Sequence, residues 1–312
     1  MRLIFMGTPR FAVPTLTRLL SSRHQVIAVF TQPDAVAGRG GQLSVPAVKQ
    51  VAMEHGIEVY QPEKLRPETW LTGLNGAEAD VIVVVAYGKI LPPWLVNWAK
   101  HGAVNLHASL LPKYRGAAPI NWAIANGETC TGVTTMKINE KLDSGDIYLQ
   151  EGVGIGPHDS ASDVHDRLAA LGADLMLKTL ELLESRQLQP IPQNPELATY
   201  APMLKKSDGH LNWEQSATKI YNRIRGFNPW PGTYTYIHGT LLRIWTACPL
   251  EMSDDQLPGT LSHSGTHGAV VTCRPGLLQL REVQLENRRR IAGIDFLHGI
   301  RLHENQSILL GR

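Results

Sequence analysis

The chain has 312 residues, of which 43% are hydrophobic and 19% charged, a composition typical of a globular protein with a sizeable core and a length that favours two domains. Its net charge of +2 argues against a protein that binds nucleic acid over its whole surface. Three scattered cysteines without a CxxC pair argue against a disulfide framework or a metal site. Because no apolar run is long enough for a secretory leader or a membrane span, we expect a cytoplasmic protein.

The first half of the chain alternates strand-like and helix-like segments. Apolar and β-branched runs predict strands at residues 3–6, 25–31, 80–85, 102–106 and 131–137, and helical spacing predicts helices after Pro14, at 45–55 and at 160–186. The run 80–85 is almost wholly apolar, as expected for a strand buried on both faces. This alternation predicts an α/β domain over residues 1–188 with a doubly wound, mostly parallel sheet.

A proline-rich stretch divides this half from the next. Four prolines lie between residues 189 and 202, which favours extended chain and a linker over residues 189–204. One helix is then predicted at 217–225, followed by short β-runs at 232–237, 241–246, 269–273 and 277–285. We expect residues 205–312 to form a small, OB-like β-barrel.

The charge is unevenly distributed between the two halves. Residues 1–204 carry 17 Lys/Arg and 19 Asp/Glu, whereas residues 205–312 carry 13 and 9. A basic second part indicates a polyanionic partner there, although an ordinary solvated face explains the excess equally well.

Polar side chains gather where the predicted strand 102–106 ends. Strand alternation places Asn105 and His107 on one side, at the sheet edge where such folds bind ligands. A loop with Pro112 and Gly116 follows, and Asp143 lies in a second polar turn. Asn and His can stabilise the oxyanion of an acyl transfer, His can move a proton, and Asp can orient the imidazole. Each residue alone is more often structural, so this set is one interpretation of the stretch.

The same stretch carries a family resemblance. The run Asn105-Leu106-His107-Ala108-Ser109-Leu110-Leu111-Pro112, followed by Arg115-Gly116 and by Asp143 thirty-eight residues after Asn105, resembles the signature of the 10-formyltetrahydrofolate transformylases. The resemblance covers almost the whole chain. It implies a catalytic set of Asn105, His107 and Asp143. It also implies a 10-formyltetrahydrofolate co-substrate bound along Ser109, Leu110, Leu111 and Pro112.

Three further segments resemble members of this family that act on tRNA: 5–12 (FMGTPRFA), 32–41 (QPDAVAGRGG) and 228–232 (NPWPG). The resemblance implies that the acceptor is the α-amino group of methionine on initiator tRNA, reached by the loop of Gly38, Arg39 and Gly40. In the second domain we expect phosphate contacts from Lys205, Lys206, Arg288, Arg289 and Arg290, although such a basic run is usually a solvated turn. We expect a monomer without a metal and without membrane contact.

Three alternatives stay open. A sugar-nucleotide N-formyltransferase would share the run 109–116 but would not need the Arg39 loop. A barrel that binds single-stranded RNA without catalysis would need clustered surface aromatics, which the second half does not show in its sequence. A dehydrogenase is a weak rival, because Gly7 stands alone without a GxGxxG motif.

Overall fold

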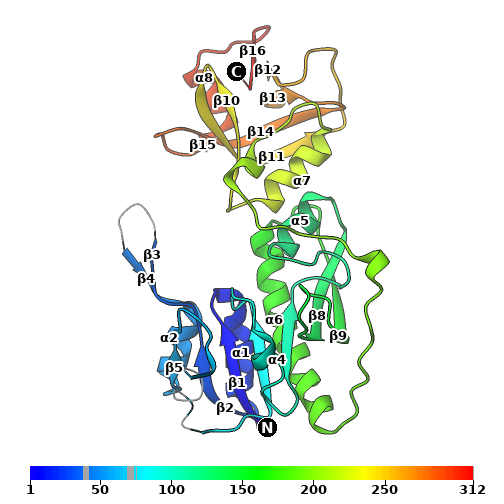
Figure 1. Ribbon diagram of the computed structural model, residues 1–312. Helices are drawn as coiled ribbons and strands as arrows, with labels where there is room; N and C mark the ends of the chain where they lie inside the picture. Colours follow the sequence, from blue (N-terminus) through cyan, green and yellow to red (C-terminus); the bar gives the residue numbers. More distant parts are fainter. Residues whose placement is uncertain (38–41, 69–73, 75, 312) are drawn as a thin grey trace. The chain divides into compact units, whose positions relative to one another are not determined.

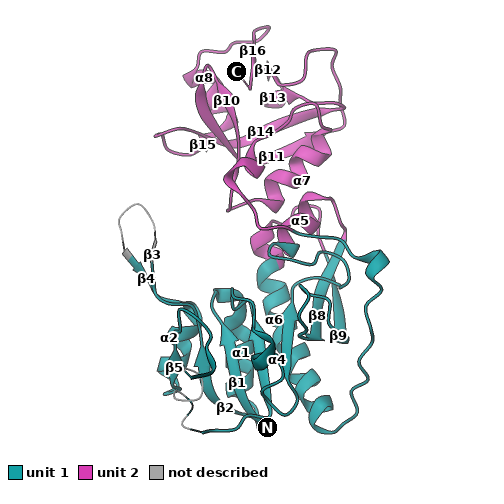
Figure 2. Cartoon of the chain, viewed as in Figure 1, with its two compact units in different colours: residues 1–119, 130–154, 165–201 teal, residues 120–129, 155–164, 202–312 magenta. Residues whose placement is uncertain are grey.

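The computed structural model describes residues 1–37, 42–68, 74 and 76–311 (Figure 1). The chain divides into two compact units (Figure 2). Unit 1 comprises Met1–Pro119, Cys130–Gly154 and His165–Ala201, and unit 2 comprises Ile120–Thr129, Ile155–Val164 and Pro202–Arg312. Helix α6 (Ala161–Glu184) therefore begins in unit 2 and continues in unit 1.

Unit 1 is built on a seven-stranded sheet. Its order is β5 (Val59–Tyr60), β2 (Gln25–Phe30), β1 (Arg2–Gly7), β6 (Val81–Val85), β7 (Ala103–His107), β8 (Cys130–Lys137) and β9 (Ile147–Gly154). The first five strands pair in parallel, as the sequence predicts, whereas β8 and β9 pair antiparallel. The sheet is mixed because β8 starts at the edge of the sheet where β7 ends, and therefore runs in the opposite direction.

Helices pack on both faces of this sheet. On one face Ile4, Met6, Ile82 and Val84 join a buried cluster that includes residues of α4 (Pro93–Val96). On the other face α6 crosses β7 so closely that a side chain at Gly172 would lie 2.6 Å from Leu106. Glycine at that point lets the helix backbone approach the strand. Among its described residues this unit also contains η1 (Arg10–Ala12), α1 (Val13–Leu20), α2 (Ala47–Glu54) and η2 (Pro195–Leu197).

The segment between β2 and α2 forms a small hairpin. Strands β3 (Ala35–Ala37) and β4 (Gln42–Ser44) pair antiparallel, and Figure 1 shows them standing clear of the seven-stranded sheet. The sequence predicts a glycine-rich loop here. Its tip, with Gly38, Arg39 and Gly40, lies outside the described residues.

Unit 2 contains a curled antiparallel sheet. Its order is β10 (Thr233–Ile237), β11 (Thr240–Leu250), β14 (Leu277–Leu285), β13 (Gly268–Thr272), β12 (Thr260–Ser264) and β16 (Ser307–Leu309), with β15 (Ile291–Ala292) paired to β14. Beyond β16 the Gly311 amide donates to the Tyr236 carbonyl, which brings the end of the sheet back to its first strand. Three helices and a short 3-10 turn complete the elements: α5 (Pro119–Ala125), η3 (Lys206–Gly209), α7 (Ala217–Gly226) and α8 (Gly293–Gly299).

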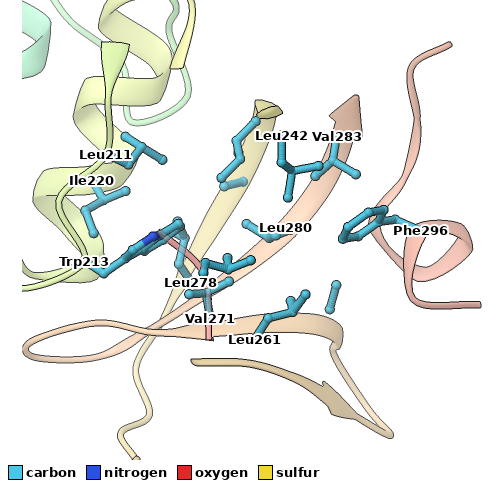
Figure 3. Close-up of a cluster of buried hydrophobic side chains, with 14 of the residues drawn as sticks. Leu211, Trp213, Ile220, Leu242, Leu261, Val271, Leu278, Leu280, Val283 and Phe296 are labelled. Carbon is cyan, nitrogen blue, oxygen red and sulfur yellow. The ribbon is translucent and has the colours of Figure 1, made fainter. Parts of the chain in front are cut away.

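A hydrophobic core fills the inside of this curl. Figure 3 shows Trp213, Ile220 and Phe296 converging on side chains from the strands, among them Leu278 and Leu280. The Trp213 indole donates to the Thr235 hydroxyl at 3.2 Å, which satisfies its buried N–H. The apolar alternation of the β-runs thus produces one buried face.

Candidate active site

Strand β7 brings two of the sequence-predicted residues to the carboxyl edge of the parallel strands. Asn105 lies opposite Met136 of β8, and His107, the last residue of β7, lies opposite Thr134. Alternation along the strand puts both side chains on the same face, with Asn105 half-buried and His107 buried. Ligands in open α/β sheets bind at this edge.

The His107 ring is held at both nitrogens. Nε2 lies 2.9 Å from the Tyr114 carbonyl oxygen, and because a carbonyl only accepts, Nε2 carries the proton of that hydrogen bond. Nδ1 faces Asp143 Oδ2 at 3.7 Å, and the two side chains are only 7% and 14% exposed. An oxygen therefore lies beside each ring nitrogen. The Tyr114 carbonyl is within hydrogen-bond distance of Nε2, and a small movement of Asp143 would bring its carboxylate within hydrogen-bond distance of Nδ1.

Asp143 occupies an unusual backbone conformation. Its φ of +46° lies in the left-handed region, which costs roughly 1–2 kcal/mol for a residue with a side chain. Its Oδ2 accepts a hydrogen bond of 2.8 Å from the Gly116 amide. Gly116 has φ +120°, and a side chain there would lie 2.6 Å from the Ala201 carbonyl oxygen, so the close approach requires glycine.

The loop from Ser109 to Gly116 is tied to the antiparallel strands. The buried Ser109 hydroxyl donates to the Lys113 carbonyl at 2.6 Å, and Thr134 donates to the Ser109 carbonyl at 2.6 Å. The Leu111 amide donates to Thr134 Oγ1 at 3.2 Å. Of the four residues predicted to line a folate site, Ser109 and Leu111 are therefore buried within the loop. Leu110 and Pro112 are half-buried and face outward in part.

The proline-rich stretch predicted as a linker is part of this site. Ile191 and Ile147 exchange two backbone hydrogen bonds of 2.8 Å. Gln193 bonds the Arg115 guanidinium and the carbonyls of Asp143 and Gly145. Neither Gln193 nor the Tyr114 carbonyl was predicted from the sequence, because the partners of Gln193 lie 50 and 78 residues away and a backbone carbonyl leaves no signal in the residue type.

The base of the β3–β4 hairpin is held by a polar network. Lys49 Nζ contacts both carboxylate oxygens of Asp34, at 2.7 and 3.0 Å, and also Gln61 Oε1 at 2.7 Å. Gln61 donates to Asp34 Oδ1 at 2.8 Å. These hydrogen bonds, that from Lys49 first, hold the pKa of Asp34 below its usual range. Asp34 directly precedes β3, so this network anchors the hairpin to the sheet.

The predicted phosphate contacts of unit 2 lie at its surface. Lys205, Lys206, Arg288, Arg289 and Arg290 are all exposed. Arg290 also stacks over the Trp245 ring at 3.9 Å and lies 3.7 Å from a carboxylate oxygen of Glu282. Its charge is thus partly engaged within the unit.

Unit 2 also carries an aromatic cluster that the sequence analysis did not find. Tyr234 and Tyr236 alternate on β10, with ring centres 5.8 Å apart, and exposed His210 lies 5.4 and 5.9 Å from them. The expectation that this half shows no clustered surface aromatics is therefore wrong. The spacing of Tyr234 and Tyr236 on β10 is visible in the sequence, but His210 comes from a separate segment and joins them only in the fold.

Within the described parts of the chain, no group of three or more His, Cys, Asp or Glu side chains is arranged to hold a metal ion. Among the described helices, none combines the length and apolar character needed to cross a membrane.

Comparison with known proteins identifies two family models along the chain. One, described as formyl transferase, matches residues 1–180, and one, described as formyl transferase, C-terminal domain, matches residues 203–301. A protein of Geobacter metallireducens named methionyl-tRNA formyltransferase is 47% identical over 96% of this chain and 96% of its own. One of the same name from Solibacter usitatus is 47% identical over 99% of this chain and 98% of its own.

A solved structure resembles the fold. It is an N-formyltransferase from Helicobacter canadensis in complex with folinic acid and dTDP-3-aminofucose, with a TM-score of 0.65 and 18% sequence identity. The match covers 92% of this chain and 99% of that chain. At this identity the likeness concerns the fold alone.

Proposed function

The chain belongs to the formyl transferase family, and we propose that it transfers a formyl group from 10-formyltetrahydrofolate to the α-amino group of methionine on initiator tRNA. The observation that carries this proposal is the His107–Asp143 pair, buried beside Asn105 at the carboxyl edge of β7. The two relatives at 47% identity, matched over nearly the whole chain, support the tRNA acceptor. The product, formylmethionyl-tRNA, would serve translation initiation, and we propose that the enzyme works in the cytoplasm.

Each member of the pair and its neighbour has a chemical task in this proposal. Attack of an amine on a formyl carbon develops negative charge on the formyl oxygen, and the half-exposed Asn105 amide can donate a hydrogen bond to it. Collapse of the resulting tetrahedral intermediate breaks the bond between the formyl carbon and N10 of the folate. The attacking amine must lose a proton, and N10 must gain one as it leaves. His107 takes part through Nδ1, because Nε2 is already bonded to the Tyr114 carbonyl. The Asp143 carboxylate orients the ring and stabilises its charged form.

The loop after β7 is the proposed folate side of the site. Leu110 and Pro112 offer partly exposed apolar surface next to His107, while Ser109 and Leu111 hold the loop to β8. The donor would thus rest on a loop whose shape is set by the antiparallel strands. No metal is required, because the proton and charge can be handled by the side chains named above.

We propose tRNA contacts in each unit separately. The hairpin tip with Gly38, Arg39 and Gly40 would reach the acceptor end, with its base anchored by Asp34 and Lys49. In unit 2, a barrel of OB-like form would present Lys205, Lys206, Arg288 and Arg289 to phosphates, with Arg290 partly engaged by Trp245. We propose that one copy of the chain suffices for this reaction.

A transfer assay tests the proposal. The purified protein is mixed with 10-formyltetrahydrofolate and methionyl-tRNA, and formyl-methionine is measured by mass spectrometry after the ester is hydrolysed. His107→Ala should lose roughly 10³-fold in kcat, the scale of lost acid–base and electrostatic groups. The matched change at exposed His55 should leave turnover intact. A parallel reaction offers a dTDP-amino sugar, and formylation of the sugar with none of methionyl-tRNA would establish the sugar-nucleotide alternative instead.

A further inference from the structure

The segment of residues 191–201, called the strap below, is bonded to the two loops that carry the proposed active site. The Arg115 amide donates to the Thr199 carbonyl at 2.8 Å, and the Ala201 amide donates to the Arg115 carbonyl at 2.7 Å. The Tyr114 amide donates to Thr199 Oγ1 at 2.9 Å. The strap thus runs beside the loop whose Tyr114 carbonyl holds His107.

One side chain of the strap reaches inward. Gln193 is half-buried, whereas its neighbours Pro192 and Asn194 are exposed. Its Nε2 donates to the carbonyls of Asp143 and Gly145, at 2.9 and 2.8 Å. Its Oε1 accepts from Arg115 Nε at 3.2 Å and Nη2 at 2.7 Å. A primary amide has two donors and two acceptor sites, and the two carbonyls and the guanidinium use all four, while Nε2 also lies 3.9 Å from the Met136 sulfur.

These contacts connect the loop that contains Arg115 with the turn that contains Asp143 through the side-chain amide of Gln193. At one end Gln193 holds the carbonyl of Asp143, the residue whose left-handed φ of +46° the surroundings must maintain. At the other end it supplies the acceptor for Arg115, which is only 7% exposed. Arg115 directly precedes Gly116, whose amide donates to the Asp143 carboxylate. Gln193 therefore bonds the backbone carbonyl of Asp143 directly. It also bonds Arg115, the neighbour of the glycine whose amide bonds the Asp143 carboxylate.

We propose that Gln193 is a positioning residue, which sets the orientation of the Asp143 carboxylate toward His107 Nδ1 and through it the rate of formyl transfer. This inference rests on the proposed function of the His107–Asp143 pair. It goes beyond it because the hydrogen bonds of Gln193 are to Arg115, Asp143, Gly145 and Met136 and not to His107, so its effect on the ring is transmitted through Asp143. If Gln193 had only a structural role, it would hold the strap to the rest of unit 1, and replacing it would not affect the imidazole of His107.

Two substitutions separate these roles. Gln193→Met removes all four hydrogen bonds at similar volume, and Gln193→Glu keeps the acceptor for Arg115 but turns the donors toward Asp143 and Gly145 into acceptors. Both should lower kcat by about 10–100-fold, the scale of a misplacement near 1 Å, with little change in KM for either substrate. The same change at exposed Gln189, Gln189→Met, should be silent. Near wild-type kcat for Gln193→Glu would mean that only the Arg115 contact matters and would overturn the proposal.

A double-mutant cycle tests whether Gln193 acts through Asp143. In an Asp143→Asn background, Gln193→Met should cost little further activity, because the carboxylate it positions is gone. Independent losses that multiply in the double variant would overturn the proposal. Urea unfolding of each variant ensures that kcat is compared between folded proteins.

A spectroscopic readout judges the proposal without any activity. The imidazole ¹⁵N chemical shifts of His107, assigned by their loss in His107→Ala, report which nitrogen carries a proton. Gln193→Met and Gln193→Glu should change these shifts, whereas Gln189→Met should not. Unchanged His107 shifts would overturn the positioning role. Failure of the wild-type chain to formylate methionyl-tRNA would instead overturn the proposed function and leave this measurement valid.

Discussion

Replacing Asp143 by asparagine removes the charge of the side chain and keeps its shape. Asp143 Oδ2 accepts from the Gly116 amide at 2.8 Å, a bond that an asparagine oxygen can keep. The same Oδ2 faces His107 Nδ1 at 3.7 Å, so an asparagine oxygen that keeps the Gly116 bond would also face Nδ1, but without the negative charge.

The size of the effect follows from the distance between the two side chains. Opposite charges 3.7 Å apart attract by on the order of 4 kcal/mol at an effective dielectric constant near 20. Solvent screens this little, since the side chains are 7% and 14% exposed. If the imidazolium forms only in the transition state, losing the attraction lowers kcat by about 10³-fold. Stability should fall by no more than about 1 kcal/mol, because the bond from Gly116 only changes from charge-assisted to neutral.

Single-turnover formylation of methionyl-tRNA at saturating donor measures the rate, and urea unfolding measures the stability. Asp143→Ala is the matched comparison. It should lose a similar factor in rate, and it should unfold more easily by about 1–3 kcal/mol because the Gly116 amide loses its acceptor. Wild-type turnover in Asp143→Asn would refute the reasoning, as would equal stability losses in the two variants.

Three further predictions concern other parts of the chain. Arg39→Ala should weaken kcat/KM for methionyl-tRNA by about 1.5–3 kcal/mol, the worth of hydrogen bonds to charged groups, and leave the KM for the folate donor unchanged; equal damage to both would contradict a tRNA contact. Burial, aided by the nearby amino terminus, lowers the pKa of His24, so the folded state binds fewer protons and stability is lost as pH falls below about 6.5. His24→Gln should flatten that loss in urea midpoints, and an unchanged pH dependence would show that another group causes it. Burial raises the pKa of Cys273 to about 12, so a thiol reagent should label exposed Cys130 in the native protein and Cys273 only after unfolding, and equal labelling rates would disprove this.

Periodicity predicted most elements of the fold correctly. The wholly apolar run that forms β6 and the β-branched run that forms β2 were recognisable because strands buried on both faces leave a continuous apolar signal. The predicted helix start at 160 also has a local cause, since the Ser160 amide donates to Asp163 Oδ2 and the Asp163 amide donates to Ser160 Oγ. The parallel direction of the first five strands followed from the alternation of strands and helices, but the direction of β8 and β9 was not predictable from such patterns. The antiparallel course of β8 and β9 depends on where the chain re-enters the sheet.

The proposed active site was likewise predictable from the sequence only in part. Asn105 and His107 could be placed together because they lie two residues apart on one strand, and a local period governs their direction. Asp143 was placed with them by resemblance, and only the structure gives its distance of 3.7 Å from His107.

By itself the sequence determined the family, the succession of elements and the residue types available for formyl transfer, because these depend on motifs and local periods. Only the tertiary structure decided which nitrogen of His107 faces Asp143, and that a proline-rich stretch interpreted as a linker supports the site. Gln193 joins Asp143 and Arg115 across 50 and 78 residues of chain. Hydrogen bonds over such separations form when packing brings backbone carbonyls and side chains together, and no pattern within a short window records them.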